Sequence, residues 1–278
     1  MSDAKDENGS PETGSFDWRG LRVLLTGGSS GIGAELAPRL AAAGATVGIV
    51  ARRVDRLEAV LDRCLAASPA SRAFPCDLTD LEAVDRLAAT ALSELGGVDV
   101  LINNAGMPKR KHATVIDADT VQQVMHLNYI SPVRLTLGLL PHFVARGSGL
   151  IVNVSSVAAT LSSPGEGAYD ASKAALAVWS EALAIDLWDL GVAVLTAYPG
   201  VVDTELFTIP DNDPLPPGID AIPVGEFVDG LLAAIAAGRR EVYVPAWFKD
   251  IVKHKNNDLE GFLAGSADYV RQQHTAAG

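Results

Sequence analysis

A glycine-rich turn between two apolar segments constrains the fold of this chain more than any other feature. The segment LRVLLTG predicts a buried strand, residues 26–33 follow it as TGGSSGIG, and AELAPRLAAAG predicts a helix that ends at Gly44. A second apolar segment, ATVGIVA, predicts a strand that ends at Arg52 and Arg53. These elements form a β-α-β unit, from which parallel sheets with helices on their faces are built.

The same turn predicts a phosphate-binding site. Gly27, Gly31 and Gly33 let the backbone approach a pyrophosphate, and the N-terminus of the following helix faces its negative charge. A turn that merely uses glycines is the alternative. The residues from Gly27 to Gly31 also match the G-x-S-x-G elbow of hydrolases. We reject the elbow because it would lie on the first strand, and no Asp-then-His order stands out downstream.

The end of the second strand predicts which dinucleotide is bound. NAD sites usually place an Asp or Glu there for the ribose 2′-hydroxyl. Arg52 and Arg53 occupy the position instead, and guanidinium groups suit the 2′-phosphate of NADP. The sequence therefore favours NADP(H) over NAD(H). Two solvated arginines at the start of a helix are the alternative.

The rest of the chain repeats the alternation of strands and helices. About seven strands and about six helices are expected, which predicts an α/β fold with one Rossmann-like, doubly wound parallel sheet. The acidic residues 1–17 are expected to be a disordered tail. A single domain is expected over residues 18–278, with a substrate lid at about 205–225 and a C-terminal extension of no clear role at 246–278.

Other strand ends supply further candidate residues, because ligands bind at the carboxyl edge of an open α/β sheet. One strand ends at Asn104, Ala105 and Gly106, and another leads into the loop Pro199, Gly200, Val201, Val202, Asp203 and Thr204. Two roles are open for Asp77, which either reaches the adenine amino group or belongs to a turn. The basic loop MPKRKH, residues 107–112, is more readily a solvated loop than a site for acidic substrates.

The segment from Ser156 to Lys173 carries the acid–base chemistry. Tyr169 and Lys173 are four residues apart in a predicted helix, so their side chains share one face. A nearby ammonium group favours the phenolate and is expected to lower the pKa of Tyr169. Ser156 follows the strand LIVNV and can hydrogen-bond an oxygen on which charge develops. A surface pair on an amphipathic helix is the alternative.

Composition excludes several classes of function. A net charge of -12 and a pI near 4.8 argue against nucleic acid and anionic membranes as partners. No run approaches the ~18 apolar residues of a membrane span, and the first residues form no signal peptide. Cys64 and Cys76 are expected to be free thiols in the cytoplasm. The five histidines show no metal-ligand spacing, so no metal is expected.

These motifs together resemble the short-chain dehydrogenase/reductase family, in its single-domain, NADP-preferring branch. The resemblance runs from about Leu21 to Pro245. It rests on TGGSSGIG, CDLTD, NNAG, Asn128, YDASK and PGVVDT, and on Ser156 standing thirteen residues before Tyr169. Each motif alone is a weak signal, but several of them in this order make the resemblance to the family specific.

The resemblance implies a role for each matching residue. Tyr169 would be the general acid/base, Ser156 would position the substrate oxygen, and Lys173 would also bind the nicotinamide ribose. Asn128 would hold a water molecule that links Lys173 to solvent. The cofactor would be held by Ser29, Ser30 and Ile32 at the phosphate turn, Arg52 and Arg53 at the 2′-phosphate, Asp77 and Leu78 at adenine, Asn104 to Gly106 beside the adenosine, and Val202 and Thr204 at the nicotinamide amide. Many NADP-preferring members carry a basic residue where Ser30 stands, which weakens this cofactor assignment.

An NADP(H)-dependent oxidoreductase acting on a carbonyl or secondary alcohol is the expected function. The apolar tail mildly favours a lipophilic substrate. The alternative is a catalytically silent dinucleotide-binding sensor or interaction protein. The resemblance also implies a homodimer or homotetramer, and the apolar stripe Leu176, Trp179, Leu183 and Leu187 fits this, although core packing explains part of it.

Overall fold

A seven-stranded parallel sheet forms the centre of the protein. The computed structural model describes residues 16–208, 211–213 and 220–276. Within them the strands are β1 (Arg22–Thr26), β2 (Thr46–Ala51), β3 (Arg72–Pro75), β4 (Val100–Asn103), β5 (Gly149–Val154), β6 (Val192–Pro199) and β7 (Glu241–Val244). Their order is β3-β2-β1-β4-β5-β6-β7, and every pair is parallel. The predicted doubly wound α/β fold is confirmed.

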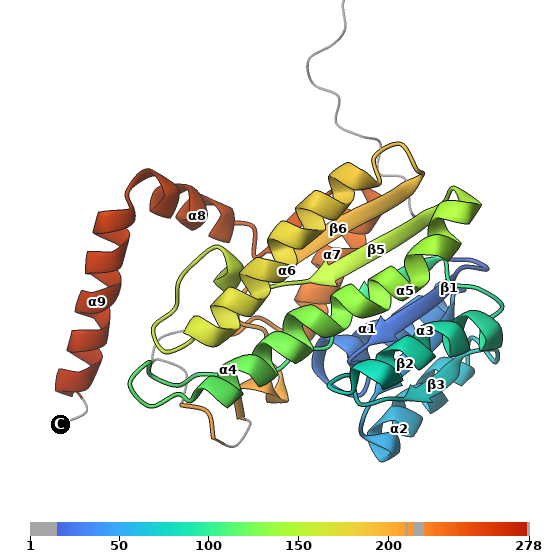
Figure 1. Cartoon of the computed structure of the whole chain (residues 1–278), viewed down its shortest axis with the longest axis horizontal. Helices are drawn as coiled ribbons and strands as arrows, with labels where there is room; N and C mark the ends of the chain where they lie inside the picture. The colour runs from blue at the N-terminus through green and yellow to red at the C-terminus, as the bar shows by residue number, and fades with distance from the viewer. Residues whose placement is uncertain (1–15, 209–210, 214–219, 277–278) are drawn as a thin grey trace, which may run out of the picture.

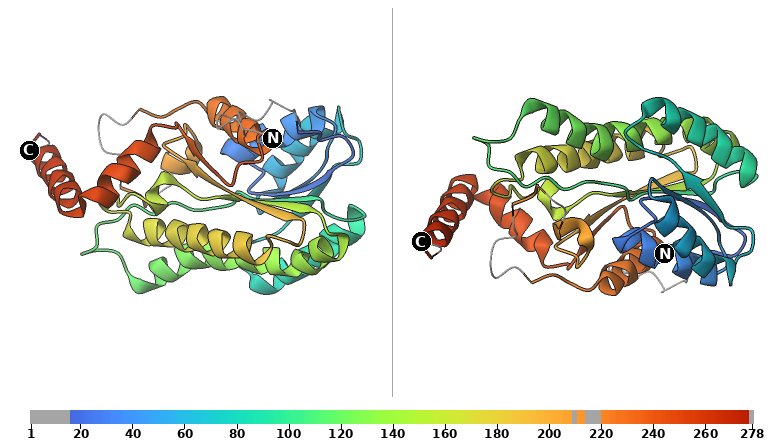
Figure 2. Two further views of the ribbon diagram at one scale, coloured as in Figure 1. Left: turned by 90° about the horizontal axis from the view of Figure 1, so that it is seen from above. Right: turned by 90° about the horizontal axis from the view of Figure 1, so that it is seen from below.

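Helices cover both faces of the sheet (Figures 1 and 2). One face carries α1 (Gly31–Ala42), α2 (Val54–Leu65) and α7 (Val224–Ala236). The other carries α3 (Leu81–Glu94), α4 (Ala118–Met125), the π-helical segment η1 (His126–Ile130), α5 (Ser131–Arg146) and α6 (Gly167–Asp186). The last helices, α8 (Phe248–Asn257) and α9 (Leu259–Ala276), extend away from this body (Figure 1).

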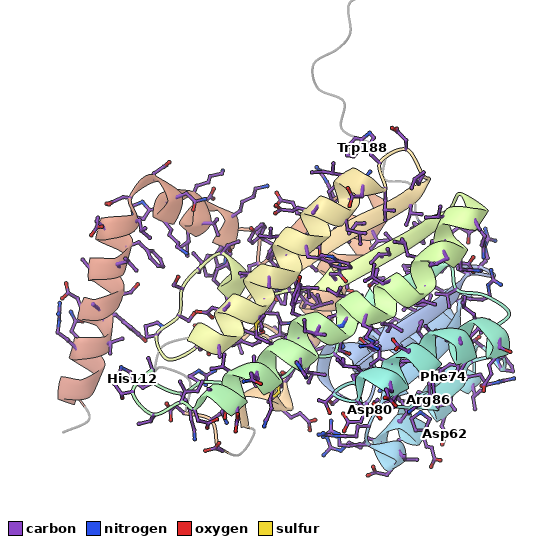
Figure 3. All side chains as sticks on the ribbon, in the orientation of Figure 1. Asp62, Phe74, Asp80, Arg86, His112 and Trp188 are labelled. Carbon is purple, nitrogen blue, oxygen red and sulfur yellow. The ribbon has the colours of Figure 1, made fainter. Side chains whose placement is uncertain are left out.

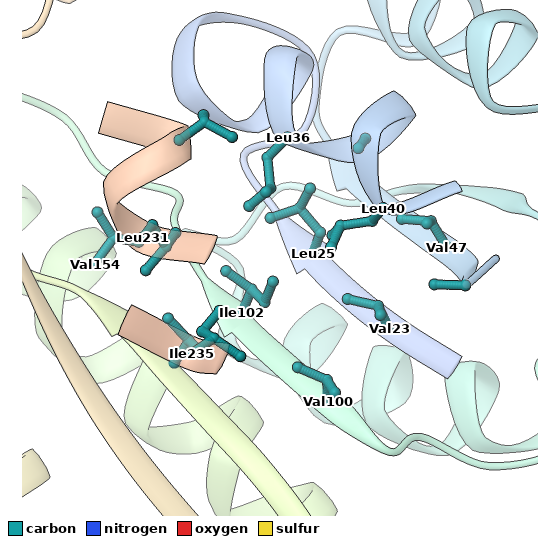
Figure 4. Packing of buried hydrophobic residues seen from close by; sticks show 14 of the residues in the cluster. Val23, Leu25, Leu36, Leu40, Val47, Val100, Ile102, Val154, Leu231 and Ile235 are labelled. Carbon is teal, nitrogen blue, oxygen red and sulfur yellow. The ribbon is translucent and has the colours of Figure 1, made fainter. Parts of the chain in front are cut away.

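The apolar core has one layer on each side of the sheet. Along β1, Leu25 points to the layer under α1 and α7, whereas Leu24 points to the layer under α3 and α5. Figure 4 shows the first layer, in which Leu36 and Leu231 meet the strand side chains. Because both faces are covered, the central strands are continuously apolar rather than alternating, as expected for a parallel sheet.

The predicted apolar stripe on α6 belongs to this core. Leu176, Leu183 and Leu187 are buried, and Trp179 packs against the layer under α3 and α5. The stripe is therefore core packing rather than a free face, and the homo-oligomer stays a prediction that rests on the family resemblance. Packing of α6 onto the sheet accounts for the stripe.

The helical segment from Ala118 to Arg146 is interrupted at Asn128, which lies in η1. The amide of Ser131 donates to the carbonyl of His126, five residues back, which is the π-helical pattern. Pro132 has no N–H and cannot donate to the carbonyl of Asn128, four residues back, so a regular α-helix loses one bond here. The π-helical turn is wider than an α-helical one, and it places Asn128 in the interior of the protein.

The predicted flanking segments are only partly described. The expected disordered tail at 1–17 lies outside the described residues except for its last two, and Phe16 packs against Trp18 with ring centroids 4.7 Å apart. The folded body therefore begins by Phe16. The predicted lid at 205–225 starts as a 3₁₀ turn, η3 (Glu205–Thr208), and residues 209–210 and 214–219 lie outside the described part.

Candidate active site

A cleft of about 650 Å³ lies at the carboxyl edge of the sheet. This volume is typical of small-molecule and cofactor sites. The sheet order reverses direction between β1 and β4, and ligands of such sheets bind at this crossover. Of the predicted site residues, the cleft is lined by Gly27, Ser29, Ser30, Gly31, Ile32, Arg52, Arg53, Asp77, Leu78, Asn104, Ala105, Gly106, Ser156, Tyr169, Lys173, Pro199, Gly200, Val202 and Thr204. Gly33 and Asn128 lie behind this lining.

The glycine-rich turn has the shape that a pyrophosphate needs. Gly27 has a φ of 68°, and a Cβ there would lie 2.8 Å from the Cα of Ala105. A Cβ at Gly33 would lie 2.3 Å from the carbonyl oxygen of Gly27, so this glycine lets α1 start directly on the turn. Ser30 precedes α1 without a side-chain cap bond. The first N–H groups of a helix have no intrahelical acceptor, and the first two residues of α1, Gly31 and Ile32, line the cleft.

The arginines after β2 reach the same end of the cleft. Arg53 donates from Nη2 to Ser30 Oγ at 2.8 Å and to Glu205 Oε1 at 2.5 Å. Arg52 is more exposed, and its Nη1 lies 3.7 Å from Asp77 Oδ2. The donor set of Arg53 and Ser30 beside the phosphate turn fits a 2′-phosphate.

Asp77 has the turn role in this structure. Its Oδ1 accepts hydrogen bonds from the backbone N of Thr79 at 3.0 Å and from the hydroxyl of Thr79 at 2.8 Å. These bonds hold the pKa of the Asp77 carboxyl below its usual value. Asp80 caps α3 by accepting from Glu82 N and Ala83 N. Asp77 still lines the cleft, so a contact with adenine remains a prediction.

The acid–base residues line the same cleft. Tyr169 and Lys173 are one turn apart on α6, and Lys173 Nζ lies 5.9 Å from the centre of the Tyr169 ring. Lys173 is buried, and its Nζ donates to the carbonyl of Val154 at 2.9 Å. Ser156 lines the cleft with Tyr169, and its hydroxyl oxygen accepts from Ala158 N at 3.1 Å. A phenol and a hydroxyl thus line the same cleft.

The expected lowering of the Tyr169 pKa is wrong for this structure. Burial raises the pKa of the phenol more than the nearby Ser156 hydroxyl and the charge of Arg110 lower it. The same burial lowers the pKa of Lys173 to about 8. Desolvation penalises the charged form of both Tyr169 and Lys173. Lys173 therefore holds its proton less tightly than the sequence suggested.

Asn128 is fully buried beside these residues. Its Oδ1 accepts from Met107 N at 2.8 Å, and its Nδ2 donates to Met107 O at 2.9 Å and to Ser172 Oγ at 3.0 Å. A Cβ at Gly106 would lie 3.2 Å from Lys173 Nζ and 3.3 Å from Asn128 Oδ1. Gly106 is thus the residue that lets these two polar groups approach the cleft wall together.

The basic loop is not solvated throughout. Arg110 lines the cleft and is buried; its Nε donates to Glu166 Oε1 at 2.6 Å and its Nη1 to Asp213 O at 2.7 Å. Lys109 pairs with Asp211 at 2.8 Å. Sequence reasoning missed Glu166 and Glu205 as site residues. No local pattern marks them, since their partners lie far away along the chain.

The described part of the chain contains no group of three or more side chains that could hold a metal ion. His112, for example, lies in the outer loop beside α4 (Figure 3). In the same ranges, no helix is both long enough and apolar enough to cross a bilayer. Cys64 and Cys76 are free.

Comparisons with known proteins point to one family. The family model for short chain dehydrogenases matches residues 22–213. A fatty acyl-CoA reductase of Acinetobacter baylyi is 39% identical over 190 residues, and the matched part spans 68% of this chain but only 64% of that protein. A fatty acyl-CoA reductase of Mycobacterium tuberculosis is 34% identical over 87% of each chain. Among solved structures, a short-chain dehydrogenase from Sphingobium yanoikuyae in complex with NADPH superposes with a TM-score of 0.75 at 32% identity, covering 87% of this chain and 95% of that one.

Proposed function

Because this chain belongs to the short-chain dehydrogenase/reductase family of oxidoreductases, we propose that it is an NADP(H)-dependent enzyme that transfers a hydride between the nicotinamide and a carbonyl or alcohol carbon. One observation carries the proposal. The Tyr169 phenol and the Ser156 hydroxyl line one cleft, and Tyr169 lies one helical turn from the buried Lys173.

The cofactor assignment rests on the first half of the cleft. The pyrophosphate would lie on Gly27 to Ile32, the 2′-phosphate beside Ser30 and Arg53, and the adenosine against Asn104 to Gly106. Val202 and Thr204 would face the nicotinamide amide, and all of these residues line the cleft. The Sphingobium neighbour in complex with NADPH supports NADP(H) over NAD(H). When bound, the cofactor supplies or accepts the hydride.

The protein's own residues would handle the proton and the substrate oxygen. A raised pKa keeps Tyr169 protonated at neutral pH, which is the form that donates a proton to a carbonyl oxygen during reduction. Ser156 would donate a hydrogen bond to the same oxygen. Lys173 would contact the nicotinamide ribose and offset charge on the Tyr169 oxygen. Asn128, beside Lys173 behind Gly106, would hold the water that replaces the proton.

Replacement of Tyr169 by Phe tests the mechanism. We expect kcat with NADPH and a carbonyl substrate to fall about 10²- to 10⁴-fold, while the Kd for NADPH changes little, because the phenol proton is needed only for chemistry. Tyr198→Phe is the matched control, since Tyr198 is a buried tyrosine of β6 that stacks on Tyr243 outside the cleft lining. Retained turnover in Tyr169→Phe contradicts the mechanism. NADPH binding without turnover in the native protein favours the silent sensor.

A thioester is the second candidate substrate, because two relatives are fatty acyl-CoA reductases. Hydride addition and proton transfer to the thioester carbonyl would give a hemithioacetal, which loses the CoA thiol and leaves an aldehyde. Apolar side chains of the cleft lining, including Met107 and Val157, suit a lipophilic acyl chain. Release of free thiol in step with NADPH oxidation distinguishes thioester reduction from ketone or aldehyde reduction.

We also propose that the protein is a cytoplasmic homodimer or homotetramer. Apolar side chains remain exposed on two adjacent helices, with Leu137 on α5 and Val178 and Ile185 on α6. These two helices lie side by side on one face of the molecule (Figure 1). Trp188, just after α6, is also exposed (Figure 3). Sedimentation of the native protein beside an Ile185→Glu variant tests this surface.

A further inference from the structure

Glu205 occupies the anion-binding end of the cleft with its own carboxylate. Its Oε1 accepts from Arg53 Nη2 at 2.5 Å, and its Oε2 accepts from Arg56 Nη1 at 2.5 Å. Arg53 uses the same Nη2 to reach Ser30 Oγ at 2.8 Å. Three segments distant in sequence thus meet at one carboxylate: the phosphate turn, the start of α2 and the loop after β6.

The position of this carboxylate overlaps the expected place of a 2′-phosphate. Ser30, Arg53 and Glu205 all line the cleft. The side chain just before Glu205 also closes onto the phosphate turn, since Thr204 Cγ2 would lie 3.0 Å from a Cβ at Gly31. A phosphate seated on Ser30 and Arg53 would therefore meet a negative charge that already holds the same guanidinium.

We propose that Glu205 is a specificity-determining residue that competes with the cofactor's 2′-phosphate for Arg53. The inference rests on the proposed NADP(H) site. A phosphate monoester carries about -1.5 to -2 charges at neutral pH, more than a carboxylate, so it can displace Glu205 from Arg53. NAD(H) lacks this phosphate and leaves the Glu205 contacts in place. Glu205 thereby reduces the preference for NADP(H) over NAD(H) below what Arg53 alone would give.

Two nucleotides that differ only in the 2′-phosphate test the competition. Adenosine 2′,5′-bisphosphate and adenosine 5′-monophosphate are titrated calorimetrically into the native protein and into Glu205→Gln. We expect the variant to bind the bisphosphate about 3- to 20-fold more tightly, the range set by losing two exposed ion pairs, and to bind the monophosphate unchanged. The ratio of Kd for NADH to Kd for NADPH, followed by nicotinamide fluorescence, should rise by the same factor.

Glu35→Gln is the matched control. Glu35 also pairs with two arginines, Arg39 at 2.8 Å and Arg63 at 3.8 Å, but it lies outside the cleft lining. Glu35→Gln removes the same charge as Glu205→Gln, so an electrostatic effect that does not depend on the position of the carboxylate would appear in both variants. Thermal unfolding checks that both are folded. In an Arg53→Gln background, Glu205→Gln should no longer change bisphosphate binding, because the shared guanidinium is gone.

The possible results separate this inference from the proposed function. Unchanged or weaker bisphosphate binding in Glu205→Gln, with binding to the native protein intact, overturns the competition and leaves the NADP(H) site standing. Equal tightening of both nucleotides also overturns it, since the effect would then not involve the 2′-phosphate. Failure of every variant to bind either nucleotide overturns the cofactor site and the competition together.

Discussion

The buried ammonium of Lys173 should make stability depend on pH in a predictable direction. Lys173 is 3% exposed, and burial lowers its pKa from 10.5 to about 8. The unfolded chain therefore binds this proton more tightly than the folded protein, and the free energy of unfolding rises with pH across the window from 8 to 10.5. A shift of this size corresponds to about 3 kcal/mol of destabilisation at neutral pH.

Replacement by Met isolates this contribution, because Met fills a similar volume and does not titrate. Between pH 7 and 9.5, the free energy of unfolding of the native protein relative to Lys173→Met should rise by about 2 kcal/mol. This is the share of the destabilisation by the buried ammonium that is relieved over that pH interval. The loss of the hydrogen bond to Val154 O adds an offset that is nearly the same at both pH values.

Urea unfolding of both proteins at the two pH values measures the difference. Lys253→Met is the control, because it removes an ammonium group from an exposed position on α8, where its partner Asp250 is also exposed and desolvation is absent. A relative stability that stays constant within about 0.5 kcal/mol would refute the depressed pKa. A fall with rising pH would mean that the folded protein stabilises the ammonium, and the reasoning from burial would fail.

Two further predictions concern stability and binding. Glu166→Gln removes the carboxylate that pairs with the buried guanidinium of Arg110, so it should lower the free energy of unfolding by about 3 kcal/mol in a urea titration. Asp229→Asn is the control at an exposed ion pair, and it should lower the free energy of unfolding by less than about 1 kcal/mol. Gly27→Ala should abolish binding of adenosine 5′-monophosphate or unfold the turn, because its Cβ would lie 2.8 Å from neighbouring backbone. Gly20→Ala has a similar φ, 74°, but open space, so it should show only the conformational cost of about 1 kcal/mol and keep nucleotide binding intact.

The sequence alone determined the fold class and most of the cleft lining. The glycine turn, Arg53 and Asn104 each follow an apolar strand, and parallel strands bring their carboxyl ends to one edge. The pairing of Tyr169 with Lys173 is equally local, since residues four apart in a helix share a face. These predictions needed only periodicity and neighbours in the chain, which fix backbone geometry before any tertiary contact forms.

The tertiary structure alone decided which charges meet and what burial does to them. Glu205 reaches Arg53 across 152 residues, and Arg110 reaches Glu166 across 56, so neither pair has a sequence signature. The pKa directions of Tyr169 and Lys173 were likewise beyond local reasoning. Spacing shows that the two groups are near each other, but desolvation depends on everything that packs around them, and here it is the largest cause of both pKa shifts.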